Sequence, residues 1–170
     1  MNLIIETKRL VLTPFGLDDA DLFHQLNINP YIKEFLWDSE QITLDEAREI
    51  MLKNERHFEK DSFGLWMVKL KDTEETIGYT GLWYFFGEKQ PQLVYALLQQ
   101  FTKQGYAKEF SKAIIRYSFE TLNFKYLIAA TDEPHLASQK VAKSVGMKLQ
   151  ERRIENGKPT LFFKIEKGRK

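Results

Sequence analysis

The amino-acid sequence predicts one domain of the mixed α+β class, and three observations support this prediction. The chain has 170 residues, which is enough for one substantial core and too few for two. Alternating apolar residues bounded by turn residues predict β-hairpins both before and after the middle of the chain. Between these hairpins a strand, a turn with one glycine and an amphipathic helix follow in order, which does not fit a repeated parallel pattern.

The composition is that of an ordinary soluble globular protein. Hydrophobic residues make up 43% of the chain and charged residues 29%, and the formal net charge is +1. This balance argues against a nucleic-acid or anionic-membrane binder. No apolar run is long enough to span a bilayer and the N-terminus lacks a signal-peptide pattern, so we expect a cytoplasmic protein. We expect no disulfide, because there is no cysteine, and no metal, because His24 and His57 have no matching ligand set.

The chain begins with a predicted strand and two short segments. Apolar residues alternate over residues 3–13, which predicts a strand that ends at Pro14. Residues 17–26 predict a short helix, because aspartates stand near its positive end and residues 27–30 break the pattern. Residues 31–37 form a second short segment, rich in aromatic residues.

A longer helix and a hairpin follow. Thr43 and Glu46 form a capping box, which predicts a helix that runs to about residue 60. Its predicted inner positions are Ile50, Met51, Asn54 and Phe58. The apolar spacing then changes to alternation, so residues 63–71 and 76–86 are expected to pair as a hairpin.

The centre of the chain has a pattern suited to an anion. A strand over residues 92–98 runs into a polar turn with Gly105, and a helix follows to Glu120. The apolar positions of this helix are Phe110, Ala113, Ile114 and Tyr117. The first N–H groups of a helix are unpaired and carry partial positive charge, and Lys103 and Lys108 add to it, which favours a phosphate site. The alternative is that the glycine merely reverses the chain.

The last part of the chain predicts a strand, a helix and a second hairpin. Residues 126–131 are apolar without polar alternation, which predicts a strand buried on both faces. A helix over residues 136–145 is stopped by a glycine. Residues 147–154 and 159–166 are predicted to pair around the turn Asn156-Gly157.

Two of these segments resemble one known family. Residues 102–107, Thr-Lys-Gln-Gly-Tyr-Ala, resemble the pyrophosphate-binding turn of the GNAT acyl-CoA N-acyltransferases. They are most similar to the branch that acetylates ribosomal-protein N-termini (RimJ/RimL-type). Residues 6–12 also resemble the opening strand of that branch. The family pattern is Arg/Gln-x-x-Gly-x-Gly/Ala. The chain keeps Gly105 and Ala107, and it departs at Thr102 and at Lys103, where the family often has Gly.

The second segment is residues 132–147, which resemble the family segment Asn-x-x-Ser followed after seven residues by Gly-Phe. The match covers His135, Ser138, Gly146 and Met147, with His in place of Asn and Met in place of Phe. The resemblance covers nearly the whole chain, and it implies a single GNAT domain over residues 1–170. The implied fold has a central, mostly antiparallel, twisted sheet of roughly six or seven strands that is flanked by helices and splayed in the middle.

The resemblance also implies a reaction. Members of the family transfer an acetyl group from acetyl-CoA directly to a primary amine, either a protein N-terminal α-amine or a small-molecule amine, in a ternary complex. The glycine turn would hold the pyrophosphate, the strand before it would pair with the pantetheine amides, and the backbone N–H of Leu97 would polarise the thioester. The implied cofactor-binding residues are Tyr95, Ala96, Leu97, Leu98, Lys103, Gln104, Gly105, Tyr106, Ala107, Lys108, His135, Ser138 and Lys140.

The proton carriers depart from the family. Many members carry a tyrosine four residues after the position of Ser138, but this chain has Ala142 there, so we expect Ser138 to be the acid; capping the helix is its alternative role. His135 would contact the cofactor or cap the same helix. The family carboxylate before the turn is replaced by Gln92, which cannot take a proton. The remaining candidates for the base are Glu34, Glu88, Asp132 and Glu133.

The acceptor side is predicted only in part. The segment over residues 31–37 matches the wall of the acceptor site, so we expect Trp37 and Glu34 to bind substrate, together with Glu88. A protein N-terminus, an amino acid, a polyamine and an aminoglycoside all remain open as acceptors, and the protein is expected to be a monomer or homodimer with no nucleic-acid or membrane partner. The alternative function is a catalytically weak acyl-CoA-binding protein with a sensing or scaffolding role.

Overall fold

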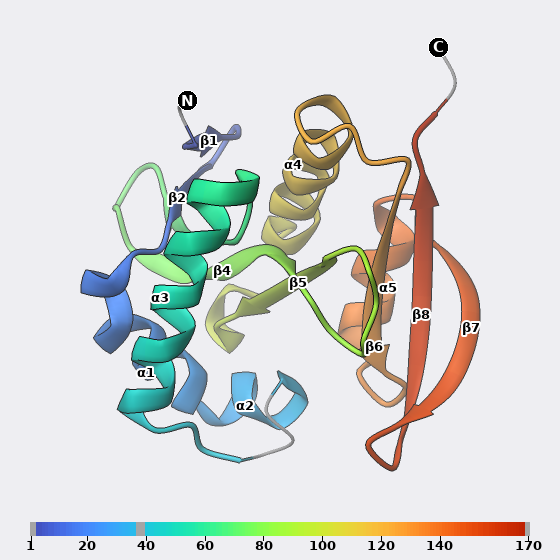
Figure 1. Ribbon diagram of the computed structural model, residues 1–170, viewed down its shortest axis with the longest axis horizontal. Coiled ribbons are helices and arrows are strands. Elements are labelled where there is room, and N and C mark those ends of the chain that lie inside the picture. Colours follow the sequence, from blue (N-terminus) through green and yellow to red (C-terminus); the bar gives the residue numbers. More distant parts are fainter. Residues whose placement is uncertain (1–2, 37–39, 169–170) are drawn as a thin grey trace.

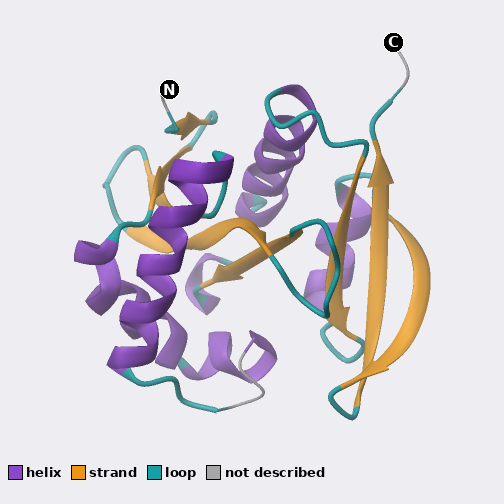
Figure 2. Ribbon diagram, viewed as in Figure 1, coloured by secondary structure: helices purple, strands orange, loops and turns teal. Residues whose placement is uncertain are grey.

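The structure is a computed structural model that describes residues 3–36 and 40–168. Its strands form two antiparallel sheets (Figures 1 and 2). In spatial order, the larger sheet contains β1 (Ile5–Glu6), β2 (Leu10–Pro14), β3 (Leu65–Leu70), β4 (Thr76–Trp83) and β5 (Gln92–Leu97). The smaller sheet contains β6 (Tyr126–Asp132), β8 (Lys158–Glu166) and β7 (Lys148–Glu155), in that order. This arrangement confirms the mixed α+β class, and the expected splay divides the strands into two sheets.

Helices cover both faces of the larger sheet. Among the described residues they are α1 (Ala20–Ile28), α2 (Pro30–Leu36), α3 (Leu44–Asp61), α4 (Tyr106–Glu120) and α5 (Leu136–Ser144). Alternate residues of β5 enter two different cores, because side chains of a strand point to opposite faces in turn. Leu93 and Leu97 pack in the core that contains residues of α4, whereas Val94 and Ala96 pack in the core that contains residues of α1 and α3.

The first predicted strand is divided in the structure. Residues 3–13 contain most of two strands, β1 and β2, which run antiparallel with Ile5 opposite Leu12. The chain reverses because the Thr7 N–H donates to the Leu10 carbonyl at 3.0 Å. This reversal was not predicted, because residues 7–9 contain neither glycine nor proline.

Strand β6 is not buried on both faces, so that prediction was wrong. Leu127 and Thr131 are buried, but Ile128, Ala129 and Ala130 are only partly buried. The reason is that residues 129–132 line a pocket instead of packing against another layer. A run of apolar residues does not distinguish a buried strand from the wall of a cavity.

Helix α3 begins at the predicted capping box. Thr43 Oγ1 accepts a hydrogen bond from the Glu46 N–H at 3.1 Å. Of its predicted inner positions, Met51, Asn54 and Phe58 are buried and Ile50 is partly buried.

Asn54 joins α3 to the larger sheet. Its side chain is fully buried, and Nδ2 donates to the carbonyls of Phe15 at 3.0 Å and Leu65 at 3.2 Å. Its Oδ1 accepts from the Leu65 N–H at 2.7 Å. One amide therefore satisfies backbone groups at the end of β2 and at the beginning of β3.

We expect Asn54→Ala to lower the free energy of unfolding by about 2–4 kcal/mol, because it leaves buried backbone groups without partners. Urea denaturation measures the loss. Lys53→Ala, one position away on the exposed face of α3, is the control and should change the free energy of unfolding by less than about 0.5 kcal/mol. Equal losses in the two variants would contradict a structural role for the amide.

Candidate active site

Strand β5 has one paired backbone edge and one open edge. The Leu98 N–H donates to the Ile77 carbonyl at 2.9 Å, and Thr80 Oγ1 donates to the Val94 carbonyl at 3.0 Å, so these groups face β4. Successive residues of a strand direct their backbone groups to opposite edges, so the N–H groups of Tyr95 and Leu97 face away from β4. No backbone ladder joins this edge to β6 in the described part of the chain.

The open edge of β5 suits an extended ligand. Where both strands begin, Gln90 Nε2 donates to the Tyr126 carbonyl at 2.6 Å and ties β5 to β6. Beyond this tie, the backbone groups of β5 need a partner, and a ligand with amide groups can supply one as another strand would. The Leu97 N–H lies on this open side, whereas the Leu98 N–H is already engaged by β4.

The turn after β5 exposes the beginning of α4. Gly105 occupies the N-cap position with a φ of 84°, and Lys103 has a φ of 63°. Glycine adopts this left-handed backbone easily, because it has no Cβ. Gly105 offers no side-chain cap to α4, so the first N–H groups of the helix are available to an anion.

The first hairpin holds this turn in place. Arg9 Nη1 donates to the Gln104 carbonyl at 2.9 Å, and the Arg9 guanidinium lies 4.2 Å over the Tyr106 ring. Glu109 accepts from Arg9 Nε at 2.7 Å and from Thr7 Oγ1 at 2.6 Å. Burial acts to raise the pKa of Glu109, but the hydrogen bonds from Thr7 and Arg9 outweigh it and lower the pKa. We did not predict this role for Arg9, because 100 positions separate it from Glu109.

A pocket of about 340 Å³ opens beside β5 and this turn, and we term it the lysine pocket. Lys103, Lys108 and Lys140 line it, and its described lining contains no Asp or Glu. The structure thus brings together most of the predicted cofactor-binding residues, namely Tyr95, Ala96, Leu97, Lys103, Gly105, Tyr106, Ala107, Lys108, His135 and Lys140. Leu98, Gln104 and Ser138 lie outside this lining.

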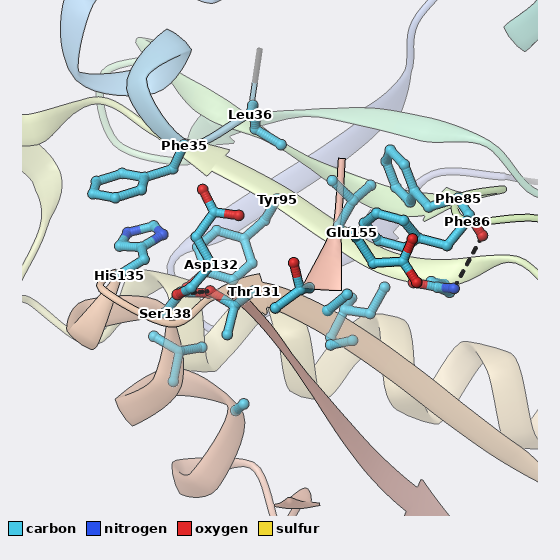
Figure 3. A pocket seen from close by; sticks show the side chains of 18 of the residues that line it. Phe35, Leu36, Phe85, Phe86, Tyr95, Thr131, Asp132, His135, Ser138 and Glu155 are labelled. Atoms are coloured by element: carbon cyan, nitrogen blue, oxygen red, sulfur yellow. Dashed lines mark hydrogen bonds between the residues drawn. The ribbon is translucent and has the colours of Figure 1, made fainter. Parts of the chain in front are cut away.

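A second pocket of about 210 Å³ adjoins the first, and we term it the carboxylate pocket (Figure 3). It is lined by Asp132 and Glu155, with Lys158 as a cation beside them. The residues that line both pockets are Phe35, Leu36, Tyr95, His135 and Val141. The two pockets therefore meet between β5, α2 and α5.

A pair of stacked rings closes over the place where the pockets meet. The rings of Phe35 in α2 and His135 before α5 are 3.9 Å apart at an angle of 7° (Figure 3). Burial lowers the pKa of His135, so its imidazole is neutral near pH 7. His135 occupies the N-cap position of α5 but makes no side-chain cap hydrogen bond. Its ring stacks on Phe35 and does not cap the helix.

Ser138 binds a tyrosine on the opposite wall. A side-chain hydrogen bond joins Ser138 in α5 to the Tyr95 hydroxyl in β5. Burial raises the pKa of Tyr95 to about 12, and the hydrogen bond with Ser138 acts in the opposite direction without reversing the shift. Two hydroxyl groups, both neutral at physiological pH, therefore lie together where the pockets meet.

Two predicted acceptor residues, Glu34 and Glu88, do not line a pocket. Glu34 is exposed on α2, and Glu88 Oε1 accepts from Arg153 Nη2 at 2.9 Å. Neither residue is part of the lining of either pocket. Trp37 lies outside the described residues.

One of the four predicted base candidates lines a pocket. Asp132 lines the carboxylate pocket, with its Oδ2 3.9 Å from Lys158 Nζ. Glu133 is instead paired with Arg152 at 3.1 Å on the surface. Glu155, which also lines this pocket, was not predicted; its one signal in the sequence is its position just before the Asn156-Gly157 turn.

Within residues 3–36 and 40–168, no group of three or more His, Asp or Glu side chains is placed to hold a metal ion. In the same ranges, every helix is too short or too polar to cross a membrane.

The family follows from a comparison with family models. A model described as an acetyltransferase (GNAT) domain matches residues 9–148. This range contains β5, the glycine turn, α4, β6 and α5, and most of the residues that line the two pockets lie within it. The chain therefore belongs to the GNAT acetyltransferase family and is an acetyl-CoA-dependent N-acetyltransferase, which confirms the resemblance seen in the sequence.

Individual proteins agree with this assignment. The uncharacterized N-acetyltransferase YnaD of Bacillus subtilis is 27% identical over 148 residues, which cover 85% of this chain and 82% of that protein. An acetyltransferase structure from Agrobacterium tumefaciens has a TM-score of 0.83 at 21% identity and covers 96% of this chain and 94% of its own. RimL, a ribosomal L7/L12 α-N-protein acetyltransferase solved with coenzyme A, has a TM-score of 0.81 at 16% identity, covering 96% and 97%. These structures confirm the expected fold and include the RimJ/RimL branch.

The stacked His135 predicts a pH dependence. Its folded pKa is lowered, so the unfolded chain binds the proton more readily, and stability falls as the pH decreases through about 6.5. We expect His135→Phe, which keeps a ring against Phe35, to have a flatter profile of Tm between about pH 7.5 and 5 than the wild type. Parallel profiles for the two proteins would contradict this assignment.

Proposed function

We propose that this chain transfers an acetyl group from acetyl-CoA directly to a primary amine while both substrates are bound. The amine is a protein N-terminal α-amine or a small-molecule amine. One observation carries the proposal: a pocket lined by three lysines meets a pocket lined by two carboxylates at Tyr95 and His135. An anionic cofactor and a cationic amine are thus attracted to opposite sides of one junction.

The lysine pocket has the groups that acetyl-CoA requires. The beginning of α4 at Gly105 would hold the pyrophosphate on backbone N–H groups, and the three lysines would surround the phosphates. The open edge of β5 would pair with the pantetheine amides. The Leu97 N–H would donate to the thioester oxygen, where negative charge develops as the amine attacks.

Ser138 would protonate the departing sulfur. Its hydroxyl is bound to Tyr95, whose raised pKa keeps a proton available beside it. Ser138 would give its proton to the thiolate and receive one from Tyr95, in the manner of a general acid. The phenol that many family members carry at the position of Ala142 is thereby supplied from β5 instead.

Asp132 would receive the proton that the amine loses. It lines the carboxylate pocket and precedes His135, whose N–H donates to the Asp132 carbonyl at 2.9 Å. Asp132 would first take the ammonium proton and pass it to solvent, which frees the lone pair of the amine. As the new N–C bond forms, the C–S bond breaks; the second proton from nitrogen goes to Asp132, and the proton on sulfur comes from Ser138. No protein nucleophile is needed, in agreement with a chain that has no cysteine.

A catalytically weak acyl-CoA-binding protein is the second candidate. It is favoured by Gln92, which is buried at the position where the family has a carboxylate. Thiol release from acetyl-CoA across a panel of amines and N-terminal peptides separates the two functions. Turnover supports transfer, whereas binding of acetyl-CoA without turnover of any member supports the second candidate.

Acetyl-CoA should raise the Tm of the wild type, because a ligand that binds the folded state alone stabilises it, by about 2.7 kcal/mol at 100 times Kd. Gly105→Val should abolish this shift, because it places a branched side chain on a left-handed residue where the pyrophosphate meets the backbone. Gly87→Val is the matched control, since Gly87 has a φ of 68° with no atom near its Cβ position, and the shift should persist there. An undiminished shift in a folded Gly105→Val protein would exclude the turn from the site.

Ser138→Ala should lower kcat more than it raises the KM for acetyl-CoA, because the hydroxyl acts mainly as the thiolate forms. General acid catalysis is worth roughly 10²–10⁴-fold, so steady-state kinetics will detect the loss. Ser144→Ala, on the same helix with its Oγ bonded to the Val141 carbonyl, should retain wild-type kcat. A wild-type kcat in Ser138→Ala would contradict the role of Ser138 as the acid and leave it a structural role alone.

A further inference from the structure

The amide of Gln92 is buried with one atom unpaired. The residue lines the carboxylate pocket and is 1% exposed, and its Nε2 donates to the Phe85 carbonyl at 3.3 Å. A carbonyl must face the NH₂ group, so this bond fixes which end of the amide is oxygen. Oε1 has no hydrogen-bond partner among the described residues. A buried acceptor in this state points to an N–H donor that arrives with a ligand.

The same end of the carboxylate pocket carries surplus negative charge. Glu155 lies there with Phe85 and Phe86, away from Tyr95 (Figure 3). Its Oε1 is 3.6 Å from Arg153 Nη1. That guanidinium is shared by three carboxylates, from Glu88 at 2.9 Å, Glu151 at 3.2 Å and Glu155. Lys158 also lines this pocket and lies 3.9 Å from Asp132, so two cations stand against four carboxylates, and the surplus negative charge attracts a further cation.

The two ends of the pocket are well separated. Asp132 adjoins His135 at the junction with the lysine pocket, where Ser138 and Tyr95 are bonded. Gln92 stands three residues before Tyr95 on β5, which corresponds to about 10 Å along a strand. A ligand that reacts at the junction can therefore reach Gln92 only with a second, distant group.

Apolar residues of β5 and β6 line the pocket between its ends, namely Leu93, Ala129 and Ala130. Phe85 and Phe86 stand at the far end (Figure 3). The pocket, at about 210 Å³, is smaller than the roughly 300–1,000 Å³ of common ligand sites. Its small volume and apolar lining suit a narrow hydrocarbon chain, and the aromatic faces at its far end also attract an ammonium.

We infer that the acceptor is an elongated diamine. One primary amine reacts beside Asp132, and a second, protonated nitrogen binds Glu155 and the Oε1 of Gln92. The hydrocarbon chain between the two nitrogens lies along Leu93, Ala129 and Ala130, and Phe85 and Phe86 flank the second nitrogen. This inference rests on the proposed function and names its substrate class, an α,ω-diamine or polyamine. The carboxylates at the far end of the pocket would repel an amine that carries a carboxylate at its own far end.

Three acceptors that differ only in the far group test the inference. They are hexane-1,6-diamine, hexylamine and 6-aminohexanoate, which end in an ammonium, a methyl and a carboxylate. Thiol release from acetyl-CoA gives kcat/KM for each. We expect the diamine to exceed hexylamine by about tenfold or more, and 6-aminohexanoate to be the poorest of the three.

Variants at the far end should remove this preference. In Glu155→Gln the ratio of kcat/KM for the diamine to that for hexylamine should fall toward one, and Gln92→Leu should lower it as well. Because the Gln92 amide also holds the Phe85 carbonyl, Glu155→Gln decides the test if Gln92→Leu does not fold. Glu166→Gln makes the same change of charge on β8 outside both pockets and should keep the wild-type ratio.

The outcomes separate this inference from the function on which it rests. Equal kcat/KM for the diamine and hexylamine, or an unchanged ratio in Glu155→Gln, overturns the diamine and leaves N-acetylation standing. N-terminal peptides that surpass all three acceptors also overturn the diamine, while they sustain transfer to a protein amine. Turnover of no amine and no peptide overturns both.

Discussion

The structure depends on a backbone edge that the protein leaves open in its interior. Pairing β5 with β6 would complete one continuous sheet, and the hollow between them would disappear. Gln90 ties the strands where they begin, and side chains of α5 such as Val141 line the gap farther on. Because buried N–H and C=O groups require partners, this edge suits an extended ligand, which would pair with it in place of the next strand.

The sequence was sufficient for the elements that local chemistry determines. The capping residue Thr43, the left-handed Gly105 and the Asn156-Gly157 turn each depend on residues a few positions apart, and each helix or strand was predicted where it occurs. The reversal within residues 3–13 was missed because residues 7–9 contain neither glycine nor proline, and because the carboxylate that holds Thr7 and Arg9 belongs to the distant Glu109 on α4. The exposure of β6 was missed for a similar reason, since a cavity has no periodicity of its own.

The candidate site also has a part that local sequence predicts and a part that it does not. Lys103 and Lys108 belong to one short segment, so the sequence was enough to predict that they lie at one site. The resemblance added Lys140, and all three line the lysine pocket. The acceptor side is assembled from β5, β6, α2 and the β7–β8 turn, which no short motif connects. Glu155 and the unpaired oxygen of Gln92 could be found only once these elements were placed together.

The contact between Arg9 and the Gln104 carbonyl extends the cofactor site to the other end of the chain. It joins residues 95 positions apart, and the same guanidinium holds Glu109 in the first turn of α4. The β1–β2 hairpin therefore holds the turn in place, although it lines neither pocket. Substitutions in this hairpin can consequently change the affinity for a nucleotide, even where every residue that contacts the nucleotide stays the same.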